Sequence, residues 1–405
     1  MVGTCNSVRC LPTSALSRAE VTGDFGGSPM RQSFKVIVHA PIMEFTKSGS
    51  SSRHAVREAA LKLSLFSVQD HYPDGARTVP QLYKQVIDQA VLAEELGYAA
   101  FFSAEHHFHP YGVVPNPTAL LCGIAQRTTR IRLGTAISIL TFHNPRTAAE
   151  IFAMADILSD GRFVLGAGSG YLKHEFEGFD VDPAEKRDRF DECLAIVERL
   201  LSGERVTCHA KFSRLDAVKL NVEPIQRPVP LYVAILRKEA AYHVGLQGRG
   251  LLTVPYGSLD HVDEIGSLVS EFRRGRIDAG NKAVALPQAL GDNIVCLHTH
   301  VAETDAAARK EASGPFDLYV ETRLYAKKMV YDDILRSGIH LFGSVETVTK
   351  KLCALADMGV DHVMTMQNFG NMAPAYVTNS MRLLAERVMP QVRQRQASRS
   401  LRGVA

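Results

Sequence analysis

The residues best suited to chemistry lie in three polar or glycine-rich turns, and the first is Glu105-His106-His107. It follows directly after an apolar run. Imidazole titrates near neutral pH, so His106 is a candidate for passing a proton or for hydrogen-bonding a charged intermediate. The alternative is that both histidines only bond neighbouring loop backbone. We favour the functional interpretation for His106. In extended backbone His107 should point away from His106, and for His107 we favour neither interpretation over the other.

The second turn contains Gly168, Ser169, Gly170 and Tyr171. Successive glycines let backbone N–H groups approach an anion, and Ser169 adds a hydroxyl donor. The pattern is neither GxGxxG nor a P-loop, so taken alone it fits a tight strand-to-helix turn equally well. The third turn begins with Arg237, a cation that suits phosphate, although such charged runs are usually solvated.

The elements that must position these turns are short apolar strands that alternate with helices. Strands are expected at residues 62–68, 98–103, 131–139, 162–167, 231–235, 250–254, 293–298 and 362–366. Helices are expected between them, including one that Thr78 caps and Gly97 ends, and others at 116–128, 144–158, 183–201 and 374–395. Strands that are apolar on both faces are typical of a parallel sheet. The sequence therefore predicts an α/β fold, a single eight-stranded parallel β/α (TIM) barrel with loop insertions. All three turns then fall at the C-terminal ends of the strands, where such barrels carry out their chemistry.

The barrel domain is expected to span residues 61–395. Residues 1–60 contain glycine- and serine-rich runs with little periodic pattern, and they are expected to form a disordered extension. A transit peptide and an unneeded upstream stretch of reading frame are the alternatives. Residues 396–405 are expected to be a disordered tail. Helix-rich insertions are expected at 203–228 and 302–340.

The chain has 405 residues and is 46% hydrophobic, which is enough for a large core. Its net charge of +3 arises within residues 1–60, and the rest is neutral, which argues against a nucleic-acid or membrane partner. The seven cysteines are scattered and include no CxxC pair, a pattern that favours a reducing, cytoplasmic location. No apolar run approaches membrane-spanning length.

The chain resembles the bacterial luciferase-like, flavin-dependent monooxygenases over roughly residues 61–395. The resemblance is carried, in chain order, by Glu105-His-His-Phe108, Asn116-Pro117, Gly134-Thr-Ala136, Asn144-Pro-Arg146, Ser159-Asp-Gly-Arg-Phe163, Gly168-Ser-Gly-Tyr171, His174-Glu-Phe-Glu-Gly-Phe179, Phe342-Gly-Ser344 and Met389-Pro390. The resemblance implies a barrel that binds reduced FMN supplied by a separate flavin reductase. It also implies that O2 adds to the flavin and that the peroxyflavin oxidises a small organic substrate. A homodimer is implied as well.

The resemblance also assigns roles to residues. His106 corresponds to the family's catalytic histidine. Ala136 and Ile137 correspond to a strained backbone, a cis non-proline peptide, beneath the flavin ring. The phosphate loop includes Ser169, with the backbone from Gly168 to Tyr171. Luciferase has an arginine where this chain has Ser169, so we expect Arg237 to supply the missing cation.

Three alternatives remain open. Some relatives use a deazaflavin coenzyme and transfer hydride without oxygen. A metal-dependent barrel hydrolase is less favoured, although His107/His109 and His298/His300 have ligand-like spacing; we expect no metal, because no matching carboxylate cluster follows a strand. A non-catalytic, flavin-binding barrel is the third. The segment from Leu297 to His300 resembles the family branch associated with natural-product biosynthesis, while the substrate itself is not readable from the sequence.

Overall fold

The computed structural model describes residues 60–75, 77–283, 285–287, 289–323 and 328–402. The extension expected at residues 1–60 lies outside the described residues, apart from Ala60.

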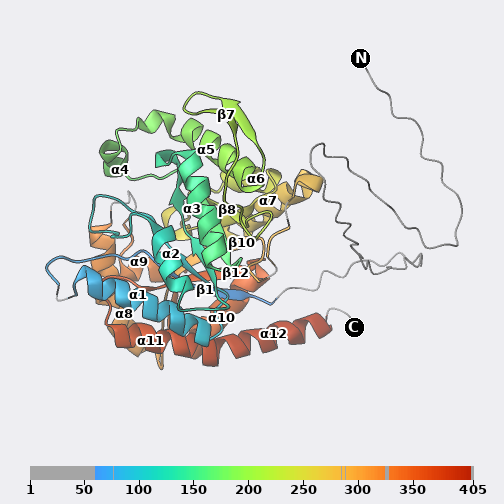
Figure 1. Cartoon of the computed structure of the whole chain (residues 1–405). Coiled ribbons are helices and arrows are strands. Elements are labelled where there is room, and N and C mark those ends of the chain that lie inside the picture. The colour runs from blue at the N-terminus through green and yellow to red at the C-terminus, as the bar shows by residue number, and fades with distance from the viewer. Residues whose placement is uncertain (1–59, 76, 284, 288, 324–327, 403–405) are drawn as a thin grey trace, which may run out of the picture. The chain divides into compact units, whose positions relative to one another are not determined.

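Eight parallel strand positions close into a barrel, as the sequence predicts (Figure 1). The strands are β1 (Lys62–Ser67), β2 (Ala100–Ser103), β3 (Arg132–Thr135) with its continuation β4 (Ser138–Ile139), β5 (Phe163–Gly168), β8 (Leu231–Ile235), β9 (Gly250–Thr253), β10 (Asn293–Ala302) and β12 (His362–Asn368). Neighbours along the chain pair in parallel, and the β9–β10 and β12–β1 pairings complete the ring. The strand expected at 131–139 is the only one of the eight that is broken, into β3 and β4.

Helices surround the barrel (Figure 1). They are α1 (Val79–Glu95), α2 (Pro117–Ala125), α3 (Pro145–Leu158), α4 (Lys173–Gly178), α5 (Lys186–Leu201), α6 (Ala240–Leu246), α7 (Glu264–Ala279), α8 (Asp305–Thr322), α9 (Tyr331–Ser337), α10 (Val345–Asp357), α11 (Pro374–Arg382) and α12 (Met389–Arg402). The helix α1 begins as predicted. Thr78 and Gln81 form a capping box, which satisfies N–H groups that have no partner within the helix.

Two expectations about the elements are wrong in detail. The insertion at 203–228 is not helix-rich, because β6 (Val206–His209) and β7 (Arg214–Val218) form an antiparallel ribbon there. The ribbon projects at the edge opposite α11 and α12 (Figure 1). The strand β10 is longer than predicted, because β11 (Leu341–Ser344), which was not expected as a strand, pairs with its second half. The insertion at 302–340 does contain helices, α8 and α9.

The described end of the chain continues as the helix α12 to Arg402, so the tail expected at 396–405 overlaps this helix. Inside it, Gln396 accepts a hydrogen bond from the N–H of Leu61, at 3.1 Å. The last helix thereby contacts the start of the barrel.

The strand registers align polar residues at one end of the barrel. Ser67, Ser103 and Thr135 are neighbours across β1, β2 and β3. All three are buried. The residues that follow them, including Glu105 and His106 after β2, therefore gather at the C-terminal mouth, where β/α barrels carry their active sites.

None of the helices among the described residues is both long enough and apolar enough to cross a bilayer.

Candidate active site at the C-terminal mouth of the barrel

A buried carboxylate holds His106, the predicted catalytic residue. Its Nδ1 lies 3.1 Å from Oε1 of Glu175. His106 is 9% exposed and Glu175 is 1% exposed. The same oxygen accepts the backbone N–H of His107, also at 3.1 Å. An ionised carboxylate only accepts hydrogen bonds, so this contact matches the tautomer of His106 that has its proton on Nδ1 and its lone pair on Nε2.

Glu175 is a site residue that the sequence analysis did not single out. It lies on α4, which follows the glycine turn after β5, whereas His106 follows β2. The two residues are 69 positions apart, so no local motif joins them. The only signal was that the segment from His174 to Phe179 belonged to the family resemblance.

A second carboxylate, Glu105, organises the other side of the turn. Its Oε1 accepts hydrogen bonds from Nε2 of His107 at 3.1 Å and of His143 at 2.8 Å. Its Oε2 accepts from the hydroxyl of Ser138 and the N–H of Ile139, at 3.0 and 3.2 Å. Although burial raises the pKa of Glu105, the hydrogen bonds from the two histidines bring it down to about 2. Glu105 is therefore an ionised anchor that ties the turn after β2 to β4.

His107 thus has a structural partner of its own. Its ring packs at 4.7 Å from that of Phe179 and 5.6 Å from that of Phe108. Phe142 stacks on Phe179 at 4.7 Å. These contacts favour the interpretation of His107 as a packing residue.

The break between β3 and β4 is the cis Ala136–Ile137 peptide bond that the family resemblance implied. Ala136 and Ile137 are both half-buried at the mouth. The glycines of β5 lack side chains that would collide with this break. A Cβ atom on Gly166 would lie 2.1 Å from the carbonyl oxygen of Thr135, and one on Gly168 would lie 2.5 Å from Cδ1 of Ile137. Gly168 therefore serves close packing against the break as well as the turn that follows.

Thr141 links the glycine turn to the start of α5. The hydroxyl of Thr141 donates to the carbonyl of Ser169 at 3.0 Å and lies 3.5 Å from the carbonyl oxygen of Lys186. Burial, and then the positive charge of Arg237, lower the pKa of Lys186. The positive charge of Arg237 therefore acts on Lys186.

Lys186 is the second residue that the sequence analysis missed. It begins α5, in a charged stretch that reads as solvated surface. The structure leaves it half-buried, while Arg237 is exposed. Ser169, Lys186 and Arg237 come from three separate segments, and we call these three residues the positive rim.

The histidines with ligand-like spacing each have other partners in the described part of the chain. Within the part of the chain that the structure describes, no group of three or more His, Cys, Asp or Glu side chains is arranged to hold a metal. His107 bonds Glu105 and His300 bonds Glu311 at 2.8 Å, while His298 is enclosed by aromatic rings.

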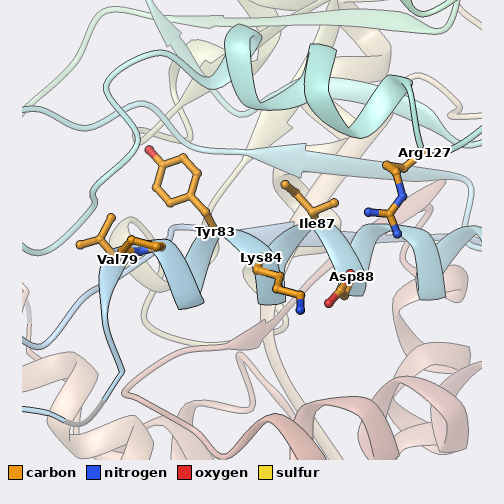
Figure 2. A pocket seen from close by; sticks show the side chains of 7 residues that line it. Val79, Tyr83, Lys84, Ile87, Asp88 and Arg127 are labelled. Atoms are coloured by element: carbon orange, nitrogen blue, oxygen red, sulfur yellow. The ribbon is translucent and has the colours of Figure 1, made fainter.

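Two hollows differ in their chemistry. One of about 450 Å³ is lined by the turn after β2, including His106, His107 and His109. The other, of about 520 Å³, lies on the outer helices and is lined mainly by Val79, Tyr83 and Ile87 of α1, with Arg127 at its edge (Figure 2). The first adjoins the predicted catalytic residue. The second contains none of the predicted site residues.

Residues 62–362 match the luciferase-like monooxygenase family, and the chain belongs to this family. Among solved structures, the crystal structure of monooxygenase RslO1 from Streptomyces bottropensis superposes with a TM-score of 0.74 and 26% identity, over 82% of this chain and 99% of that one. The oxygenase component of flavin-dependent trigonelline monooxygenase from Acinetobacter baylyi is 26% identical over 62% of this chain and 68% of its own length.

Relatives with another coenzyme match as well. An F420-dependent glucose-6-phosphate dehydrogenase from Amycolatopsis mediterranei is 30% identical over 42% of this chain and 53% of its own length. The chain spans 52–57% of the length of several other curated relatives. Family membership therefore leaves the coenzyme and the reaction to be argued from the site.

Proposed function

We propose that the protein is an FMN-dependent monooxygenase that uses O2 to oxidise a small organic molecule at the mouth of the barrel. The observation that carries the proposal is the buried His106–Glu175 pair at the C-terminal mouth of the barrel. Membership of the luciferase-like monooxygenase family supports it.

The residues at the mouth fit a flavin. The small side chain of Ala136 allows a flat ring to lie close to the backbone. Ser169, the backbone from Gly168 to Tyr171, and Arg237 would hold the phosphate, and we add Lys186 to this set. Bare backbone and a guanidinium fork both suit phosphate geometry. When bound in its reduced form, FMN supplies the electrons for the reduction of O2.

Within this mechanism, His106 handles a proton at Nε2. Glu175 fixes the ring by holding Nδ1–H, so that Nε2 keeps one orientation. The imidazole is nine-tenths buried and lies at the wall of the hollow of about 450 Å³. A positioned acid or base of this kind typically accelerates a reaction by about 10²–10⁴-fold.

The proposal includes a separate flavin reductase as partner. The trigonelline monooxygenase named as an oxygenase component supports this two-protein arrangement.

The proposal also includes a homodimer. The helix α3 carries three exposed apolar side chains, Met154, Ile157 and Leu158, which are 50%, 42% and 47% exposed. Light scattering of the purified chain measures the oligomeric state directly.

The central test is binding and reoxidation of reduced FMN. The full chain is mixed anaerobically with photoreduced FMN, and stopped-flow absorbance follows the flavin after O2 is added. The proposal requires saturable binding of reduced FMN and a reoxidation time course that differs from that of free flavin. A time course identical to free flavin at saturating protein would refute it.

The second candidate is hydride transfer with the deazaflavin F420, which the dehydrogenase match supports. The two coenzymes compete for the same mouth. Titration of the chain with FMN and with F420 distinguishes them, because F420 binding without FMN binding favours the second candidate.

A further inference from the structure

The hollow of about 450 Å³ beside the candidate catalytic residue is lined by four histidines, His71, His106, His107 and His109. Two of them are bonded to the protein through Nε2. That atom of His71 lies 3.1 Å from the carbonyl oxygen of Arg77, and that of His107 lies 3.1 Å from Oε1 of Glu105. The other two are bonded to the protein through Nδ1, and their Nε2 atoms make no hydrogen bond to any residue that the structure describes.

These two Nε2 atoms have opposite polarity. His106 keeps its proton on Nδ1, toward Glu175, so its Nε2 has a lone pair and accepts. In His109, Nδ1 accepts the backbone N–H of Tyr111 at 3.1 Å. Since a backbone N–H only donates, Nδ1 of His109 has the lone pair and the ring proton lies on Nε2. The lining of the hollow thus carries one acceptor and one donor.

Electrostatics keep His109 in this neutral form. Burial lowers the pKa of its imidazole, and any positive charge on His174 or His106 lowers it further. The ring of His174 lies 5.3 Å from that of His109. At neutral pH, His109 is therefore a neutral imidazole that donates at Nε2.

Gly112 brings the two histidines together. Its N–H donates to the carbonyl of His109 at 3.3 Å, which closes a tight turn. A Cβ atom on Gly112 would lie 2.7 Å from both Cβ and Cδ2 of His106. Because Gly112 has no side chain, the turn that carries His109 packs directly against the ring of His106. The donor and the acceptor therefore belong to one wall of the hollow.

We propose that His109 is a specificity-determining residue that selects an apolar substrate with a hydroxyl group, an alcohol or a phenol. The inference deepens the proposed function and depends on it for the role of substrate. A hydroxyl group both donates and accepts, so its proton suits Nε2 of His106 and its oxygen suits the Nε2–H of His109. Phe108, Pro110 and Val113 line the same hollow and offer apolar contacts to the remainder of the molecule. Small-molecule sites typically combine such apolar walls with a few placed polar groups.

The test compares a hydroxyl compound with its methyl ether and with the matching hydrocarbon. The full chain, with FMN in excess, is titrated with phenol, anisole and toluene, and with cyclohexanol, methoxycyclohexane and methylcyclohexane. Ligand-observed NMR gives the dissociation constants without any turnover. In at least one series, the hydroxyl compound should bind about three- to tenfold more tightly than its ether, because only the hydroxyl also donates to His106. A hydroxyl compound that binds no more tightly than its analogues in either series would overturn the proposal.

Variants then assign the preference to His109. His109→Ala and His109→Phe remove the donor, so the hydroxyl compound and the ether should each lose about three- to tenfold in affinity relative to the hydrocarbon. His109→Asn should restore part of this loss, because an amide both accepts from the N–H of Tyr111 and donates.

The matched control is His71→Ala, which removes an imidazole from the same hollow whose Nε2 is already bonded to the carbonyl of Arg77. Affinities relative to the hydrocarbon that are unchanged in His109→Phe, or reduced equally in His71→Ala, contradict the assignment. If His109→Ala does not fold, His109→Phe and His109→Asn, which keep most of the side-chain volume, carry the test.

FMN affinity, measured separately on the same proteins, distinguishes this inference from the proposed function. If the chain binds no FMN but keeps a hydroxyl preference that depends on His109, the proposed function fails and the binding site for a hydroxyl compound stands. If His109→Ala weakens FMN binding and leaves the hydroxyl preference intact, His109 is a flavin contact and the inference is wrong.

Discussion

At the scale of single residues, proton transfer should depend on His106 and on Glu175, the carboxylate that holds it. His106→Ala should slow turnover by about 10²–10⁴-fold, because a positioned proton donor or acceptor is lost. Glu175→Gln should slow it by about tenfold, because a charged hydrogen bond becomes a neutral one at a cost of roughly 1–2 kcal/mol. FMN affinity should stay unchanged in both variants. The control is Glu177→Gln, whose side chain on the same helix is 62% exposed. Unchanged turnover in His106→Ala would remove its catalytic assignment.

A second prediction for single residues concerns the positive rim. Arg237→Ala should weaken FMN binding by about 10- to 150-fold, because a charged hydrogen bond to phosphate is worth roughly 1.5–3 kcal/mol. Lys186→Ala should act similarly, and riboflavin, which lacks the phosphate, should be affected far less. Lys173→Ala, with an 86% exposed side chain on α4, is the control. Equal losses for the two flavins would leave Ser169 and the backbone amides as the only anchors.

The turn that contains His106 was predictable, whereas the partners of its residues were not. An apolar run followed by Glu105-His106-His107 is a local signal, and strand ends are where barrels place such groups. Glu175 and Lys186 have no local signal, because their roles depend on contacts of α4 with the turn after β2 and of α5 with the segment after β4. The roles of the two adjacent histidines also depend on these distant partners.

At the scale of elements, β5 must lie close to the break between β3 and β4. Gly166→Ala would place a Cβ atom against the rigid backbone oxygen of Thr135, so it should destabilise the fold by about 1–3 kcal/mol or more. Gly168→Ala meets only the flexible end of Ile137, so its cost in stability should be smaller, while displacement of Ile137 should weaken FMN binding. The control is Gly123→Ala on α2, where a Cβ atom meets nothing within 4 Å. Thermal melts and FMN titrations measure both effects. Equal stability of the Gly166→Ala and Gly123→Ala variants would contradict this account.

Most elements were predictable because apolar periodicity and turn residues are local. The exceptions are those whose pairing depends on distant segments. The ribbon β6–β7 is half exposed and has only a weak alternation, and β11 becomes a strand through its contact with the second half of β10. The length of β10 could not be predicted without that neighbour.

At the scale of the whole molecule, acid stability should depend on Glu105. Its folded pKa of about 2 lies below the ordinary 4.5, so its contribution is complete above pH 4.5 and is lost as the pH falls towards 2. Burial lowers the pKa of His143, but its hydrogen bond to Glu105 raises the value above 6.5, so that contribution declines at higher pH. The melting temperature of the wild type should therefore exceed that of His143→Gln most clearly between pH 4.5 and 6.5. A difference that does not vary with pH would contradict the assignment.

The two ends of the chain should differ in their importance for the stability of the whole molecule. Residues 1–58 lack a periodic pattern, and the barrel begins with β1 at Lys62, so a chain that starts at Ala59 should melt at the same temperature as the full chain. The other end contacts the barrel, because Gln396 accepts the N–H of Leu61. A chain that ends at Arg395 should lose this bond and be less stable by about 0.5–1.5 kcal/mol. The Gln396→Ala variant of the full chain removes the same bond and should lose at least as much. A clear loss of melting temperature on removal of residues 1–58 would contradict the first prediction. An unchanged melting temperature on removal of residues 396–405 would show that the bond from Leu61 to Gln396 does not contribute to stability.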